Sequence, residues 1–286
     1  MKATAFAPVN VALIKYWGKT DEKLHLPANA SLSVNLTSLG TVTTVDWTKN
    51  AEPKIITENN FPMSAGLSSS ASGYAALTVA MATAAGLKLP EKELSRIARL
   101  GSGSACRSIP DGWVEWGVGT DKTSYGKTIF PPDWWDLRIL VVIISEKKKP
   151  VSSTAGQVKV STSPHYLARI KSIPAKIKKI KAAIKQKNFT QIGKIMEADC
   201  YSMHRVMQTQ VPPLNYLLPE THTVMQGIRQ WREEGLQSYF TINTGQNVFV
   251  FCEPQNENKL VEKLSHTRCV IEVRRDRIGS GARLLP

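Results

Sequence analysis

A glycine- and serine-rich segment that runs directly into an alanine-rich stretch constrains this chain more than any other feature. The segment reads PMSAGLSSSA from Pro62, and the alanine-rich stretch ends near Gly86. Small residues let the backbone approach an anion closely, and the helix that follows supplies unpaired N–H groups and the positive end of its dipole. The pattern lacks the lysine of a P-loop. It fits phosphate binding, and it also fits a small-residue helix start packed against a neighbour.

Two other segments place cations beside small or aromatic residues. One reads GSGSACRS from Gly101, and its Arg107 can hold a carboxylate or phosphate through two parallel hydrogen bonds. The other reads NVALIKYWGK from Asn10, where two lysines flank an aromatic pair after a predicted strand. The first segment alone also fits a surface loop with a solvated arginine, and the second also fits an interfacial aromatic pair with exposed lysines. Together, the three segments favour a phosphorylated small molecule that carries a carboxylate.

The order of predicted elements is mixed, without regular βαβ repetition, and it indicates an α+β fold. The length of 286 residues suits about two domains, and we place the boundary between 1–149 and 150–286. The early predicted elements are strands at 3–13 and 32–47, with Gly40 as a turn residue, and helices up to Gly86 and at 90–100. The later ones are a strand at 137–144, helices at 189–209, 220–233 and 257–264, a hairpin of 239–242 with 248–252, and a strand at 269–273.

The net charge of +14 invites a nucleic-acid interpretation, but the excess is confined to one stretch. Residues 146–187 hold twelve Lys or Arg and one acidic residue. Isoleucines recur there at spacings of three and four from Ile170 to Ile184, which predicts one buried helical stripe with lysines on the other faces. We therefore favour an anionic small molecule over a nucleic acid as the partner.

The cysteines are scattered along the chain, and no pair has the spacing of a metal site. A zinc site or disulfide framework is therefore not expected, and Cys106 is interpreted as a small buried thiol. The start of the chain lacks the layout of a signal peptide, and no apolar run approaches the roughly 20 residues of a membrane span. We expect a soluble cytoplasmic protein that binds no membrane.

In this order, the motifs resemble the GHMP kinase superfamily and, more closely, the diphosphomevalonate decarboxylase family. The stretches that carry the resemblance are APVNVALIKYWGK, LPANASLSVNL, NNFPMSAGLSSSASGYAAL, GSGSACRS with WVEW, VSSTAGQ with TSP, MEADCYSMH, PPLNYL and YFTINTGQN. The resemblance implies a GHMP fold. An N-terminal domain like domain 2 of ribosomal protein S5 precedes a ferredoxin-like C-terminal domain, with the active site in the cleft between them.

The resemblance also implies a reaction. The family uses ATP and Mg²⁺ to phosphorylate the 3-hydroxyl of mevalonate 5-diphosphate, which then loses phosphate and CO₂ to give isopentenyl diphosphate. This carboxy-lyase reaction belongs to the mevalonate pathway of isoprenoid biosynthesis. Members are commonly dimeric, so a homodimer is expected. Such phosphoryl transfer depends on positioning and on charge stabilisation.

The site residues implied by the resemblance fall into three groups. Arg107 and Ser104, with Asn10 nearby, hold the substrate carboxylate, and Lys15 lies close to the catalytic position at Asn243. The predicted contacts of the 5-phosphate end are Tyr16, Lys19, Ser102 and Ser153. The predicted contacts of the ATP phosphates are Gly66, Leu67, Ser68, Ser69 and Ser70, with Ser70 as a ligand of Mg²⁺.

The sequence departs from the family pattern in three places. Asn243 stands where the family carries a catalytic aspartate, and Thr244 and Gln246 change the same turn. An amide cannot act as a base, although it can orient a hydroxyl group in a loose transition state. Second, the segment 45–60, which helps to wall the nucleotide base, is much shorter than usual. Third, DGW at 111–113 replaces a Gly-Gly-Phe, and Gln157 replaces a methionine near the substrate.

These departures leave alternatives open. The protein can instead decarboxylate mevalonate 5-phosphate, or it can act without ATP on mevalonate 3,5-bisphosphate. An inactive homologue and a basic nucleic-acid-binding protein are more distant alternatives. Asp199 is the remaining acidic residue in a family-matched segment and receives no catalytic role, and His204 is interpreted as a packed or pocket residue.

Overall fold

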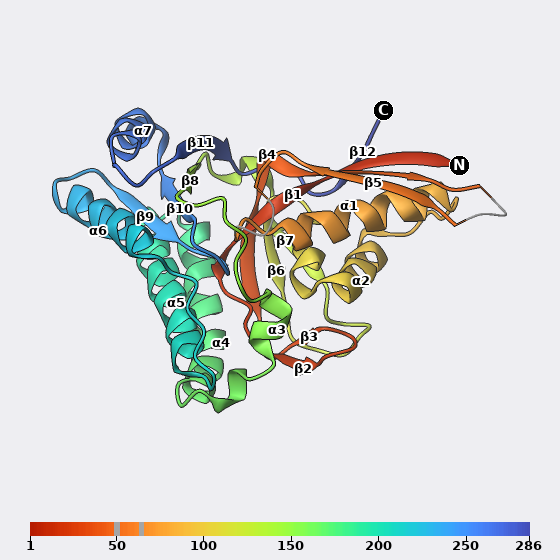
Figure 1. The fold of residues 1–286 in the computed structure, drawn as a ribbon, viewed down its shortest axis with the longest axis horizontal. Coiled ribbons are helices and arrows are strands. Elements are labelled where there is room, and N and C mark those ends of the chain that lie inside the picture. Colours follow the sequence, from red (N-terminus) through yellow and green to blue (C-terminus); the bar gives the residue numbers. More distant parts are fainter. Residues whose placement is uncertain (49–51, 63–65) are drawn as a thin grey trace.

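Two antiparallel sheets with helices packed around them make up the chain (Figure 1). The computed structural model describes residues 1–48, 52–62 and 66–286. The first sheet is built on two long strands, β1 (Lys2–Ile14) and β4 (Ser31–Asp46), which pair antiparallel along most of their length. These strands confirm the two β-like segments expected near the start of the chain.

Shorter strands complete the first sheet. β5 (Lys54–Asn59) and β6 (Trp113–Trp116) both pair with β4, and β7 (Gly126–Phe130) pairs with β6. The last strand, β12 (Arg283–Leu285), pairs with β1. Both ends of the chain therefore lie in the same sheet (Figure 1).

The turn expected at Gly40 is wrong, because Gly40 lies inside β4 opposite Pro8. A Cβ atom at Gly40 would lie 2.3 Å from the ring of Phe6, so the glycine makes room for an aromatic side chain on the neighbouring strand. A register shift between Pro8 and Asn10 follows directly. Glycine here marks a close approach within a sheet and a nearby bulge rather than a chain reversal.

Helices α1 (Ser69–Ala84) and α2 (Glu91–Gly101) lie against the first sheet and confirm the two early predicted helices. Alanines of α1 pack on alanines of β1, which brings the helix close to the strand. Ser68 precedes α1 in the left-handed conformation, with φ of 62°, and its side chain makes no capping hydrogen bond.

The second sheet has the strand order β11–β8–β10–β9, and every neighbouring pair is antiparallel. Its strands are β8 (Arg138–Ile143), β9 (Ser238–Thr241), β10 (Val248–Cys252) and β11 (Glu272–Arg277). β8, the first of these strands in the chain, lies between β11, the last, and β10, the third. This is the ferredoxin-like arrangement expected. The predicted hairpin is β9 with β10, and the predicted strand at 269–273 begins three residues later than expected.

Four long helices accompany the second sheet: α4 (Tyr166–Lys185), α5 (Phe189–Thr209), α6 (Pro219–Glu233) and α7 (Glu257–Ser265). Side chains of α4 and α5 share one core with alternate residues of β8 and with the first sheet, whereas α6 and α7 share another core with the intervening residues of β8. The α+β class is therefore confirmed. A single core links the two sheets.

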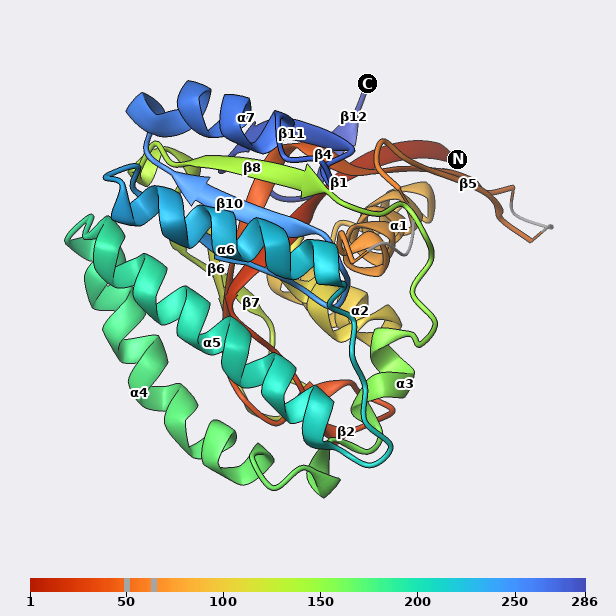
Figure 2. The same ribbon diagram turned by 60° about the vertical axis from the view of Figure 1, so that its left-hand side comes forward.

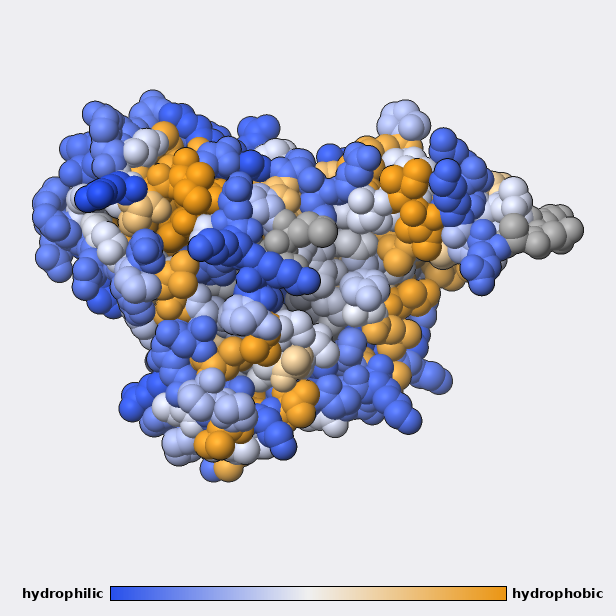
Figure 3. All heavy atoms as spheres, in the orientation of Figure 1, coloured by the Kyte–Doolittle hydropathy of each residue, from blue (hydrophilic) through white to orange (hydrophobic). Residues whose placement is uncertain are grey.

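The predicted isoleucine stripe is present on α4. Ile173, Ile177, Ile180 and Ile184 are buried, and lysines occupy the other faces. Two of these lysines pair with acidic residues elsewhere in the chain, so part of the positive charge is used within the molecule. On the face in Figure 3, hydrophobic residues form separate patches among hydrophilic ones. No helix in the described part of the chain is long and apolar enough to cross a membrane.

A segment of residues 144–152, here called the strap, connects β8 to the short helix α3 (Ser153–Gln157) and runs beside the region between the sheets (Figure 2). β8 precedes the strap in the second sheet, and β12 returns to the first sheet at the end of the chain. The domain boundary at residue 149 stays a prediction. The other short elements are the hairpin β2 (Lys19–Asp21) with β3 (Leu26–Pro27) and single helical turns at Gly103–Arg107, Pro132–Trp134, Val160–Thr162 and Pro254–Asn256.

Candidate active site

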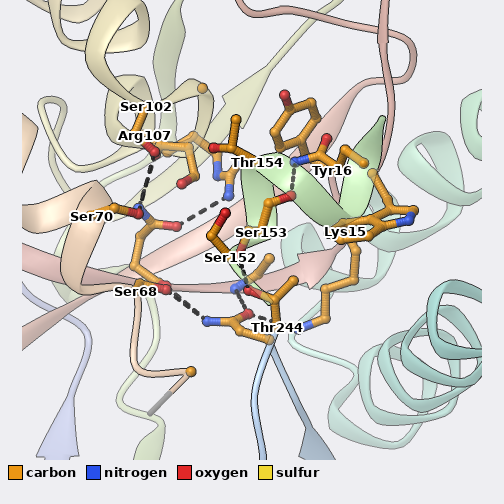
Figure 4. Close-up of a pocket in the computed structure, with 18 of the residues that line it drawn as sticks. Lys15, Tyr16, Ser68, Ser70, Ser102, Arg107, Ser152, Ser153, Thr154 and Thr244 are labelled. Carbon is orange, nitrogen blue, oxygen red and sulfur yellow. Dashed lines mark hydrogen bonds between the residues drawn. The ribbon is translucent and has the colours of Figure 1, made fainter. Parts of the chain in front are cut away.

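A pocket of about 210 Å³ opens where the first sheet, the start of α1, the strap and α3 meet (Figure 4). It gathers nearly all the residues that the sequence predicts for the site. The predicted residues that line it are Asn10, Lys15, Tyr16, Lys19, Gly66, Ser68, Ser69, Ser70, Ser102, Ser104, Arg107, Ser153 and Asn243. Leu67 alone of the predicted set does not line it, because its side chain is buried in the core.

Arg107 is buried and held in a fixed orientation. Its Nε donates to Ser33 Oγ at 3.1 Å, and its two terminal nitrogens donate to Ser31 Oγ at 2.8 Å and Asn10 Oδ1 at 3.2 Å. Asn10 is fixed in turn, because its amide group donates to the carbonyl oxygen of Ser104 at 3.1 Å. A guanidinium has five N–H donors, so this arrangement keeps donors for an anion in the pocket. Burial lowers the pKa of Arg107 from its usual range.

Lys15 and Asn243 face each other at the pocket floor. Lys15 Nζ donates to Asn243 Oδ1 at 3.0 Å, and Asn243 Nδ2 donates to Ser68 Oγ at 2.9 Å. Ser68 itself donates to the carbonyl oxygen of Asn10 at 3.1 Å. Burial lowers the pKa of Lys15 to about 8. The position predicted to be catalytic thus joins β1, the loop before α1 and the turn after β9 in one network.

A buried ion pair between Asp199 and Arg169 holds the backbone of Lys15 in place. Asp199 of α5 is fully buried, contacts Arg169 at 2.8 Å and Lys176 at 3.0 Å, and accepts a hydrogen bond from the backbone N–H of Lys15 at 2.8 Å. Arg169 also donates to the carbonyl oxygen of Lys15 at 3.0 Å. Burial alone would raise the pKa of Asp199, but the two cations outweigh it and hold the pKa below its usual value. Asp199 therefore positions Lys15 and does not enter the pocket.

His204 stays neutral behind this network. Burial lowers its pKa to about 3, and the cations Lys15 and Arg169 act in the same direction. Its Nε2 atom has no hydrogen-bond partner among the described residues. An imidazole that remains uncharged at neutral pH cannot deliver a proton there, which supports the packed-residue interpretation over a proton shuttle.

The serines before and at the start of α1 line one side of the pocket (Figure 4). Ser70 Oγ accepts a hydrogen bond from Ser102 Oγ at 3.4 Å, which joins the two predicted anion loops. Gly66 has φ of +82°, and a Cβ atom there would lie 2.4 Å from Cα of Gly245, so the loop touches the turn after β9. The predicted loop residues 63–65 lie outside the described residues.

Of the predicted contacts of the 5-phosphate end, Tyr16 lies across the pocket from Ser68 and Ser70, whereas Ser102 lies beside Ser70 (Figure 4). Tyr16 is largely buried, its hydroxyl group has no hydrogen-bond partner among the described residues, and burial raises its pKa. The hydroxyl therefore stays protonated as a donor for a ligand. Lys19 contacts Glu22 at 2.6 Å, although the Lys19 side chain is 2% exposed.

The sequence analysis missed Lys149 of the strap. Its Nζ donates to Ser153 Oγ at 2.7 Å and to the carbonyl oxygen of Thr244 at 2.8 Å, and burial lowers its pKa to about 8. Lys149 belongs to a run of three lysines that looked like ordinary solvated charge, and only the fold brings it within reach of Thr244. Other lining residues that the predicted set omits are Ala12, Trp17, His25, Gly103, Ser152, Thr154, Gln157, Met203 and Thr244.

The pocket is strongly basic. Lys15, Lys19, Arg107 and Lys149 line it, and no aspartate or glutamate is found among the described residues that do so. No cluster of three or more His, Cys, Asp or Glu able to hold a metal ion occurs in the described part of the chain. The arrangement suits an anion with several negative charges, held by cations and hydroxyl groups.

Comparison with protein-family models matches both halves of the chain. A diphosphomevalonate decarboxylase-like N-terminal domain matches residues 7–56 and 46–126. A mevalonate 5-diphosphate decarboxylase C-terminal domain matches residues 139–280. The two N-terminal matches overlap at 46–56, inside the segment that the sequence shows to be shortened.

Individual relatives give the same result. The diphosphomevalonate decarboxylase of Candida albicans is 33% identical over 315 residues, covering 92% of this chain and 87% of the relative. The solved mevalonate diphosphate decarboxylase of Staphylococcus aureus is 33% identical and superposes with a TM-score of 0.92, covering 100% of this chain and 98% of that one. The enzyme of Enterococcus faecalis superposes with a TM-score of 0.90 at 34% identity, covering 100% and 99%. The chain belongs to the diphosphomevalonate decarboxylase family.

Proposed function

We propose that this protein is a carboxy-lyase of the mevalonate pathway that converts mevalonate 5-diphosphate and ATP to isopentenyl diphosphate, ADP, phosphate and CO₂. One observation carries the proposal. The predicted carboxylate contacts Arg107, Ser104 and Asn10 and the predicted 5-phosphate contacts lie in one basic pocket of a chain that belongs to this family.

The residues present fit the phosphates of ATP. The serines at the start of α1 provide hydroxyl groups, the Ser68 side chain forms no capping hydrogen bond with the helix, and no acidic residue opposes an anion in the first turn. Mg²⁺ commonly binds through one or two carboxylates together with phosphate oxygens. The described lining has no carboxylate, so the proposed protein ligand is the Ser70 hydroxyl, with phosphates as the other ligands. A solved relative called MDDEF, with a TM-score of 0.93 at 35% identity, is in complex with MVAPP, AMPPCP and magnesium.

In the proposed reaction, ATP supplies the phosphoryl group and Mg²⁺ neutralises phosphate charge. Arg107, held by Ser31 and Ser33, orients the substrate carboxylate through paired hydrogen bonds. Loss of the 3-phosphate leaves positive character next to the carbon that carries the carboxylate, so a fixed carboxylate can leave as CO₂ and its electron pair forms the double bond. The Lys15 ammonium offsets negative charge on the departing phosphate.

In this proposal, Asn243 orients the substrate hydroxyl group and does not abstract its proton. Its carbonyl oxygen accepts from Lys15 and its amide group donates to Ser68, so the side chain has a defined orientation with no basic atom. A loose phosphoryl-transfer transition state needs little removal of the hydroxyl proton before the phosphoryl group arrives. Phosphorylation can then proceed without a carboxylate at this position.

A second candidate is a decarboxylase that takes mevalonate 3,5-bisphosphate without ATP. One observation favours it: Asn243 adds no negative charge beside Lys15. A neutral pocket floor accepts a second phosphate more readily than a floor that carries a carboxylate. Decarboxylation of mevalonate 5-phosphate is a variant of the first candidate that differs only at the 5-phosphate end.

One assay separates these candidates. Purified protein is incubated with mevalonate 5-phosphate, mevalonate 5-diphosphate or mevalonate 3,5-bisphosphate, each with and without ATP and Mg²⁺, and ADP, CO₂ and isopentenyl products are measured. The proposal requires isopentenyl diphosphate and ADP from the diphosphate only when ATP is present. Product from the bisphosphate without nucleotide establishes the second candidate instead, and absence of every product rules out both.

The family resemblance also supports a homodimer in the cytoplasm. Light scattering coupled to gel filtration tests the dimer, and a monomer mass would contradict it. We do not expect the protein to bind nucleic acid. Salt-dependent binding of RNA would contradict this expectation if it were lost when the exposed Lys178 and Lys179 of α4 are neutralised.

A further inference from the structure

Apart from Asn243, three residues around the pocket in which this chain departs from the family pattern share one property. Gln157, Thr244 and Gln246 each form a side-chain hydrogen bond with the strap or α3. The strap contacts the turn after β9 through Lys149, and α3, which follows the strap (Figure 2), contacts the loop after β1 through Gln157. The substituted side chains therefore act on one segment from two directions.

The turn after β9 holds the strap on the first side. Thr244 Oγ1 lies 2.6 Å from Ser153 Oγ, and Lys149 donates to both of these hydroxyl groups. Gln246 is 5% exposed, and its Nε2 donates to the carbonyl oxygen of Lys147 at 2.7 Å. The neighbouring Asn247 accepts from the backbone N–H groups of residues 144 and 145 at 2.7 and 3.1 Å.

Gln157 holds α3 on the second side. Its Oε1 accepts from the backbone N–H of Gly18 at 2.9 Å, and its Nε2 donates to the carbonyl oxygen of Ser153 at 3.2 Å. Gln157 is buried, so both bonds are shielded from water. Tyr216 adds a hydrogen bond from its hydroxyl group to the carbonyl oxygen of Val151 at 3.0 Å. The strap is thus tied to the body of the protein at several points along its length.

We infer that Gln157, Thr244 and Gln246 are positioning residues that hold the strap and α3 closed over the pocket before a ligand binds. They place Lys149 and Ser153 beside the site proposed for the substrate phosphates, which deepens the proposed function and rests on it. A segment that is ordered in advance does not lose conformational entropy on binding, so affinity is higher than for a loose strap. If the strap is closed in only a tenth of the molecules, the apparent Kd rises about tenfold.

Limited trypsin digestion tests the closed strap without any assumption about activity. The strap contains exposed Lys147 and Lys148, and a protease must open several residues around a bond to cut it. We expect the ligand-free protein to resist cleavage after these lysines, and Gln246→Met and Gln157→Met each to be cut there about tenfold faster. Mass spectrometry identifies the cut sites. Gln255→Met changes the same side chain at an exposed position and provides the matched control.

Cleavage within α4, after Lys178 or Lys179, reports global unfolding in the same digest. Faster strap cleavage with unchanged cleavage in α4 supports the inference, because only the strap has opened. Equal strap cleavage in the wild type and both variants overturns it. Parallel acceleration at both places also overturns it, because the glutamines then contribute only to overall stability.

A kinetic comparison at Thr244 separates positioning from packing. Thr244→Ser keeps the hydroxyl group that contacts Ser153, whereas Thr244→Val keeps the shape and removes it. We expect Thr244→Val to raise KM for the phosphorylated mevalonate about tenfold with kcat within about twofold, and Thr244→Ser to stay near the wild type. Equal KM values in the two variants contradict the inference. If the wild type has no activity, the proposed function is refuted but the inference about the strap is not. The digestion experiment still tests whether the strap is held closed.

Discussion

Arg107 is the residue whose geometry is most specific to its task. Its guanidinium is buried and fixed by Ser31, Ser33 and Asn10, and a planar fork can bind a carboxylate through two hydrogen bonds. We expect Arg107→Lys to lower kcat/KM by about 100-fold or more, because lysine keeps the charge and loses the fork. Steady-state kinetics measure this loss. The control is Arg96→Lys, because Arg96 forms a surface ion pair with Glu93 and Asp121. An equal effect in both variants would mean that Arg107 has no specific role in binding the substrate.

For two of the three pocket lysines, Lys15 and Lys149, we expect deprotonation to cause a steep loss of activity in alkaline solution. Burial lowers the pKa of Lys15 and of Lys149 to about 8, so both ammonium groups are present below this pH and are lost above it. In Asn243→Asp, a carboxylate replaces the amide oxygen 3.0 Å from Lys15 Nζ and raises the lysine pKa by about one unit or more. The pH profile of kcat/KM should therefore fall with a slope near two above pH 8 in the wild type. The variant should show a slope near one until its higher pKa is reached, and identical profiles would mean that Lys15 does not titrate in the reaction.

Regular elements with a strong local pattern were predictable from the sequence. The helix at 189–209 has the predicted bounds, and the isoleucine stripe of α4 is buried as expected. Strands β5 and β12 were both missed, although the partner of β5, β4, is close to it in the chain. β12 was missed because it has three residues and its partner is distant. β12 pairs with β1 almost a whole chain length away, and nothing in its own residues records that partner. Gly40 misled for the same reason, since the Phe6 ring that requires it lies on another strand.

Helix α5 contributes one buried charge on which Lys15 depends. Asp199→Asn leaves Arg169 buried without its counter-ion, which costs about 3–5 kcal/mol in pairs of this kind. The pKa of Asp199 is held below its usual value, so the stabilisation is present above the usual aspartate range and is lost as the pH falls through the folded-state pKa. Urea unfolding at neutral and acidic pH should show a large difference between variant and wild type that shrinks in acid. Asp136→Asn, in an exposed pair with Arg138, is the control, and a pH-independent difference would contradict the ion-pair explanation.

At the scale of the whole molecule, the candidate site exists only because two sheets meet. The residues predicted from motifs lie on β1 and the loop after it, at the start of α1, on the helical turn Gly103–Arg107, on α3 and on the turn after β9, and these motifs sufficed to bring most of the site together. Lys149 was hidden because its partner Thr244 is 95 residues away and its own surroundings read as solvated charge. The net charge of +14 also separates at this scale into pocket cations, internal ion pairs and an exposed face of α4.

Asp276 of β11 joins the two sheets, and its replacement tests whether they unfold in one cooperative transition. Its carboxylate accepts from the backbone N–H groups of Thr37, Ser38 and Leu39, at 2.8, 3.2 and 3.0 Å, and from the Ser38 hydroxyl at 2.8 Å. Asp276→Ala leaves partly buried N–H groups of β4 without an acceptor. We expect a loss of about 2–4 kcal/mol in the free energy of unfolding, because hydrogen bonds to a charged acceptor are strong and unsatisfied donors are costly.

Calorimetry should show one cooperative transition in the wild type and a broader or divided one in Asp276→Ala, with Asp133→Ala at an exposed site as the control. A variant that keeps both the wild-type Tm and a single sharp transition would show that the shared core alone couples the sheets.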